Sequence, residues 1–70
     1  MRLSARNQLR GTVKSIKLGS VMAEVVVELP DGQQIVSAIT RGSVENLGLQ
    51  VGSQVYAIIK STEVMIGKDS

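Results

Sequence analysis

The sequence contains neither cysteine nor histidine among its 70 residues. Disulfide bonds are therefore excluded, and so are the usual zinc, copper and iron–sulfur sites, which depend on thiolate or imidazole ligands. The same absences remove a cysteine nucleophile and a histidine general base, so we expect no enzyme. The single aromatic residue is Tyr56, which leaves no row of rings on which nucleic-acid bases could stack.

Long apolar runs are also missing. No segment approaches the roughly 18 to 20 apolar residues of a membrane span, and no apolar stretch follows the polar start, so we expect no signal peptide and a cytoplasmic protein. The formal net charge is +2, from eight basic and six acidic residues. The net positive charge would help to attract a small anion. The basic residues are scattered rather than clustered, which disfavours a nucleic-acid partner.

The length of the chain predicts one domain, residues 1–70. A chain this short buries only about 60% of the surface of its unfolded state, so its own core is marginal. Small proteins usually add disulfides, a structural metal or oligomerisation. With the first two excluded, we expect a homo-oligomer.

The spacing of apolar residues predicts an all-β protein with five strands and one short helix. Strands are expected over residues 9–18, 21–29, 33–40, 53–60 and 63–66. Ser43 is a good N-cap and Gly48 a good stop, which predicts a helix over residues 43–48. This element order is that of an OB-like five-stranded β-barrel with a helix after strand three. Apolar residues on both faces of several strands favour contacts between subunits.

Hydroxyl and cationic residues collect where the predicted elements end. A tetrahedral dianion such as molybdate has only acceptor oxygens, so a site that suits it is made of hydroxyls, amides and one or two cations. Taken singly, each such residue is more simply a cap or a surface charge. Glu24 and Glu28 share one strand face and are likewise more simply solvated than catalytic. Spacing alone therefore leaves the function open.

Several segments resemble the molbindin, or Mop, family. The most specific is Ser-Ala-Arg-Asn-Gln-Leu at residues 4–9, and the likeness continues through residues 11–13, 19–25, 39–49, 51–52 and 55–62. The resemblance implies an intracellular store or buffer of molybdate or tungstate, without a catalytic cofactor and without direct side-chain coordination of the metal. It also implies a homohexamer, a trimer of dimers with strands exchanged between subunits, and neither a nucleic-acid nor a membrane partner.

Carried over residue by residue, the resemblance implies two kinds of molybdate site. The main site would use Ser4, the backbone at Ala5, Arg6, Thr40, Ser43, Lys60 and Ser61. A second site near the threefold axis would use Gly19, Ser20 and Val21. Two alternatives remain open, namely an oligomeric OB- or Sm-like barrel that binds nucleic acid, and a ligand-sensing regulatory module.

Overall fold

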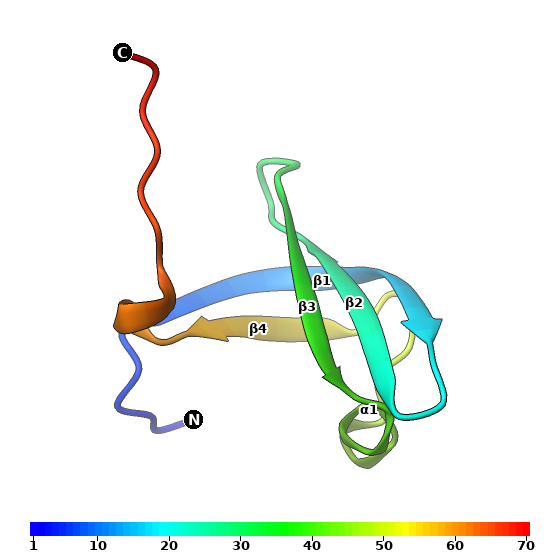
Figure 1. The fold of residues 1–70 in the computed structure, drawn as a ribbon. Coiled ribbons are helices and arrows are strands. Elements are labelled where there is room, and N and C mark those ends of the chain that lie inside the picture. Colours follow the sequence, from blue (N-terminus) through cyan, green and yellow to red (C-terminus); the bar gives the residue numbers. More distant parts are fainter.

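The computed structural model describes residues 1–70 and forms one curled antiparallel sheet with a short helix at one end (Figure 1). The elements are β1 (Asn7–Leu18), β2 (Met22–Glu28), β3 (Gln34–Thr40), α1 (Arg41–Leu47), β4 (Gln54–Ile59) and the 3-10 turn η1 (Ser61–Glu63). The strand order is β3-β2-β1-β4. The first half of β1 pairs with β4 and its second half with β2, so the β2–β3 hairpin crosses the β1–β4 pair. The predicted all-β class with one short helix is confirmed.

Alternating side chains give the sheet an apolar inner face. The buried core consists of Val13, Ala23, Val25, Val27 and Val44. Val25 and Val27 lie on the inner face of β2, as their spacing predicts, because successive strand residues point to opposite faces. Gly11 allows β1 and β2 to approach closely. A Cβ atom there would lie 2.5 Å from Val27 Cγ1 and 2.8 Å from the Glu28 carbonyl oxygen, so no side chain fits.

Helix α1 begins earlier than the sequence predicted. Its N-cap is Thr40, the last residue of β3, whose Oγ1 accepts a 3.0 Å hydrogen bond from the Ser43 main-chain N–H. The prediction of Ser43 as the cap is wrong, because Ser43 lies three residues inside, where its own N–H needs an acceptor. Gly48 ends the helix with φ 61° and ψ 37°, as predicted, since glycine adopts the left-handed conformation at little cost.

The β2–β3 connection is the predicted turn. Gly32 has φ +92°, and its N–H donates to the Leu29 carbonyl oxygen at 2.9 Å. The Gln33 side-chain amide, and then its main-chain N–H, donate to Asp31, and these bonds hold the pKa of the Asp31 carboxyl below its usual value. Local hydrogen bonds thus set the geometry of this hairpin.

The fifth strand predicted over residues 63–66 does not form within this chain. Residues 61–63 make η1 instead, and the segment after it is unpaired, with Met65 93% and Ile66 89% exposed. Figure 1 shows this C-terminal segment leaving the sheet. Because η1 directs the segment outward, β3 and β4 stay as the two free edges of an open sheet. The predicted five-stranded barrel is therefore corrected to a four-stranded sheet.

No helix of the structure is both long and apolar enough to span a membrane.

Candidate functional site

One group of predicted site residues lies together at the end of the β1–β4 pair. The register pairs Asn7 with Ile59, so the residues that precede β1 and follow β4 meet at the same end of the sheet. We call this group the N-terminal cluster; its members are Ser4, Ala5, Arg6, Lys60 and Ser61. The structure thereby joins two segments that are more than 50 residues apart in sequence.

The N-terminal cluster carries free positive charge. Arg6 and Lys60 are both exposed, and the one salt bridge of the chain joins Lys14 to Glu28 instead. The chain bends at Ser4 and again at Arg6 before β1 begins. Two unpaired cations beside hydroxyl and main-chain N–H donors make this end of the molecule suited to an anion.

The second group of predicted residues surrounds the start of α1. We call it the helix cluster; its predicted members are Gly19, Ser20, Val21, Thr40 and Ser43, and the structure adds Arg41. The Arg41 main-chain N–H donates to the Val21 carbonyl oxygen at 2.8 Å, and its Nη1 donates to the Gly19 carbonyl oxygen at 3.3 Å. Thr40 Oγ1 and Ser43 Oγ lie 2.7 Å apart. The turn assigned to the second site is thus beside Thr40 and Ser43.

Sequence reasoning did not select Arg41 as a site residue. The structure makes it the contact between α1 and the β1–β2 turn. Its position between Thr40 and Ser43 was the available signal, since it is the one cation in the Thr-Arg-Gly-Ser segment.

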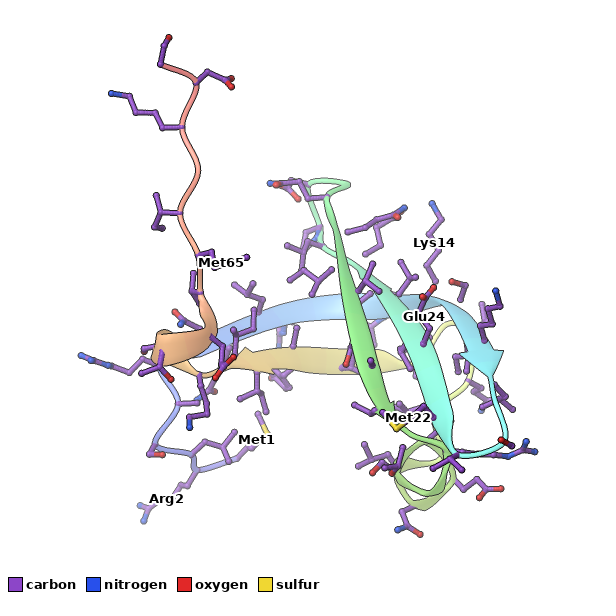
Figure 2. All side chains as sticks on the ribbon, in the orientation of Figure 1. Met1, Arg2, Lys14, Met22, Glu24 and Met65 are labelled. Atoms are coloured by element: carbon purple, nitrogen blue, oxygen red, sulfur yellow. The ribbon has the colours of Figure 1, made fainter.

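The two clusters lie at opposite ends of β1. They are separated by β1, whose 12 residues at roughly 3.3 Å each give a strand about 40 Å long, and the molecule is 40 Å along its longest axis. Figure 2 marks the two ends with Arg2, beside the chain start, and Met22, beside α1. A single chain therefore does not bring Thr40 and Ser43 to Arg6 and Lys60.

An apolar groove separates the two free edges of the sheet. It has a volume of about 310 Å³, and 13 of its 14 lining residues are hydrophobic, among them Ile35, Ile39, Val55 and Ile59. Such a lining offers an oxyanion no cation and only the hydroxyls of Ser37 and Tyr56 as side-chain donors, which are too few to replace the water that an anion loses. The groove suits an apolar segment instead.

Comparison with known proteins finds relatives over nearly the whole chain. The family model of the TOBE domain matches residues 3–66. Molybdenum-pterin-binding protein 1 of Clostridium pasteurianum is 52% identical over 66 residues, which cover 94% of this chain and 97% of that protein. These relationships extend through both clusters, since both lie within the matched residues.

Solved structures with the same fold are described by their molybdate binding. A molybdate-binding protein from Sporomusa ovata superposes with a TM-score of 0.91 at 44% identity, covering 97% of this chain and all of that one. The cytoplasmic molybdate-binding protein ModG, solved with molybdate bound, gives a TM-score of 0.84 at 49% identity, covering 87% of this chain and 43% of that one.

Proposed function

The chain belongs to the TOBE domain family, within its group of molybdenum-pterin-binding (Mop) proteins, and we propose that it binds molybdate as a hydrogen-bonded oxyanion. The observation that carries the proposal is the N-terminal cluster, in which Arg6 and Lys60 stand unpaired beside Ser4 and Ser61. A dianion with four acceptor oxygens is best held by such a set of donors. Tungstate, which has nearly the same size and charge, is proposed as an equivalent ligand.

The main site is proposed to lie between copies of the chain. The N-terminal cluster of one copy would supply the two cations, and Thr40 and Ser43 of another copy would add hydroxyls. This division follows from the opposite placement of the two clusters along β1. A second site would use Gly19, Ser20 and Val21, with Arg41 as its nearest cation.

Oligomerisation is supported by the amount of surface that one chain exposes. The accessible surface is 5680 Å², whereas a compact monomer of 7.5 kDa exposes about 4200 Å². The radius of gyration is 13.0 Å, against about 11 Å for a compact domain of this length. The excess surface includes exposed large apolar side chains, namely Met22, Val36, Tyr56 and Ile58, of which the last three line the groove. We propose a hexamer, arranged as a trimer of dimers.

The exchanged strand of this oligomer is proposed to be the C-terminal segment. Val64, Met65 and Ile66 are apolar and exposed, and they follow a turn that carries them away from their own sheet (Figure 1). The groove between β3 and β4 offers an apolar lining and two free strand edges. The segment of a second copy would fill the groove and restore the fifth strand.

The cellular role is proposed to be storage or buffering of the oxyanion by residues 1–70 acting as one cytoplasmic binding module. The relatives are named for binding rather than for catalysis, and ModG is described as cytoplasmic.

The proposal is tested by thermal unfolding in the presence of four oxyanions at equal concentration. A ligand at 100 times its Kd stabilises the folded state by about 2.7 kcal/mol, and in a domain of this size each kcal/mol raises Tm by roughly 4–8 °C. We expect molybdate and tungstate to raise Tm by about 10 °C or more, with sulfate and phosphate near zero. Equal shifts from all four anions would show that the site recognises charge alone and would overturn the proposal.

A further inference from the structure

The side chain of Gln8 closes the bend that contains Ala5 and Arg6. Its Nε2 donates a 2.6 Å hydrogen bond to the Ala5 carbonyl oxygen. Gln8 is itself held in β1, where it pairs with Ile58 of β4. The bend of the N-terminal cluster is therefore tied to the sheet by a side chain that belongs to neither of the proposed sites.

This hydrogen bond sets the direction of the next main-chain donor. The chain has no cis peptide bonds, and in a planar trans peptide the C=O and the following N–H point in opposite directions. When Gln8 holds the Ala5 carbonyl oxygen, the Arg6 N–H is therefore directed away from Gln8. The main-chain N–H groups of Ser4, Ala5 and Arg6 have no hydrogen-bond partner within the chain.

The same bond occupies an acceptor close to the proposed anion. An uncommitted carbonyl oxygen beside the site would repel a fully ionised oxyanion, but it could accept a hydrogen bond from a protonated one such as hydrogen phosphate. By holding the Ala5 carbonyl, the Gln8 amide leaves donors alone to face the ligand. The effect is on selectivity as well as on affinity.

We infer that Gln8 is a positioning residue of the oxyanion site, which orients the Ala5–Arg6 peptide so that the Arg6 main-chain N–H donates to the ligand while the Ala5 carbonyl is kept from it. This inference rests on the proposed function. It adds one main-chain donor and one selectivity-determining side chain to the proposed main site.

The test replaces Gln8 by methionine, which has a similar length and cannot donate a hydrogen bond. We expect Gln8→Met to raise the molybdate Kd of the full-length protein about tenfold, the effect of one lost hydrogen bond. We also expect the ratio of phosphate Kd to molybdate Kd to fall. The matched control is Gln54→Met, which removes a side-chain bond from Gln54 Nε2 to Thr12 Oγ1 farther along the same strand pair. Calorimetric titrations with inorganic molybdate and phosphate supply both constants.

A purely structural role for Gln8 predicts a different result. In that case Gln8→Met would lower the Tm or the oligomer mass without ligand and would weaken the binding of both anions equally. The ratio of phosphate Kd to molybdate Kd would stay unchanged, which would overturn the inference. The inference would also be overturned if Gln8→Met bound molybdate as tightly as the unchanged protein does. If the unchanged protein bound no molybdate, the proposed function itself would be overturned. A second test measures amide hydrogen exchange by NMR and uses the unchanged protein alone. Molybdate should slow exchange at the Arg6 N–H, and an unaffected Arg6 amide contradicts the inference.

Discussion

Arg6 and Lys60 are the residues on which the proposed site depends most, because they supply the charge that balances a dianion. They lie at the same end of the sheet only because Asn7 pairs with Ile59. Neither side chain forms an intramolecular ion pair, so no carboxylate must be displaced before an anion binds. Hydrogen bonds between ionised partners contribute roughly 1.5–3 kcal/mol each, which makes either cation a sensitive position.

Arg6→Ala and Lys60→Ala are each expected to weaken molybdate binding by about 10- to 100-fold, the equivalent of one charge-assisted hydrogen bond. Oligomer mass should stay the same, because both side chains are exposed. Titration calorimetry and light scattering measure the two properties. The control is Lys14→Ala, which removes an equal charge from the middle of β1, where Lys14 meets Glu28 at 3.0 Å. Unchanged affinity in both site variants would mean that the main site lies elsewhere.

At the scale of residues, the sequence indicates which side chains can donate hydrogen bonds, but it does not always indicate their local structural roles. The sequence indicates both Thr40 and Ser43 as hydroxyl residues of the site and predicts Ser43 as the N-cap, whereas Thr40 is the cap in the structure. Ser and Thr are both good N-caps, so the choice depends on where β3 ends. That end is set by the pairing of Met22 with Thr40, which is a contact between strands.

At the scale of elements, the C-terminal segment and the apolar groove are the two parts that remain incomplete in one chain. The predicted fifth strand has the right composition for a buried strand, but η1 turns it away from the sheet. Burying an aliphatic side chain contributes about 1.5–3 kcal/mol, so Val64 and Ile66 together would contribute several kcal/mol to each exchanged contact. This is enough to decide whether an oligomer persists at micromolar concentration.

Removal of residues 64–70 is therefore expected to abolish the oligomer. Light scattering should give a mass near that of one short chain, and Tm should fall because the groove loses its cover. Removal of residues 68–70 alone provides the control, since it shortens the chain but keeps the apolar residues. If the longer deletion left the mass at six chains, another segment would have to fill the groove.

At the scale of the whole molecule, the separation of the clusters is the decisive feature. Each chain presents the N-terminal cluster at one end and the helix cluster at the other. A site made from both clusters therefore joins different surfaces of two copies, and such contacts close into rings when the rotation permits. If the proposed site is shared in this way, binding and assembly stabilise each other, because the ligand would bind only the assembled state.

Complementation between two defective variants tests this arrangement. Arg6→Ala damages one half of the site and Ser43→Ala damages the other, so each protein alone should bind molybdate weakly. After the two are unfolded together and refolded as an equal mixture, about one quarter of the sites (1/2 × 1/2) should combine two intact halves from different copies. Calorimetry should detect these as a fraction of sites that bind molybdate with high affinity. If mixing restores no tight sites, the site is not shared between copies in the proposed way.

The amino-acid sequence is sufficient to identify the family, the strand periodicity and the chemical character of the proposed site. Residues 4–9 carry a specific motif, β2 alternates strictly, and the absence of cysteine and histidine limits the chemistry to hydrogen bonds and charge. These properties are local, since they depend on which residues are present and on spacings of a few positions. They are therefore readable before any fold is known.

Which of these groups lie close together depends on the tertiary fold. Strand register joined Arg6 to the end that carries Lys60, placed the Gly19–Val21 turn beside Arg41, and set both pairs an entire strand apart. The same structure showed that η1 leaves the barrel open within one chain. Register and the direction of a turn depend on contacts between distant residues, which is why the Ser-Ala-Arg motif identified the family but could not place its residues relative to Thr40 and Ser43.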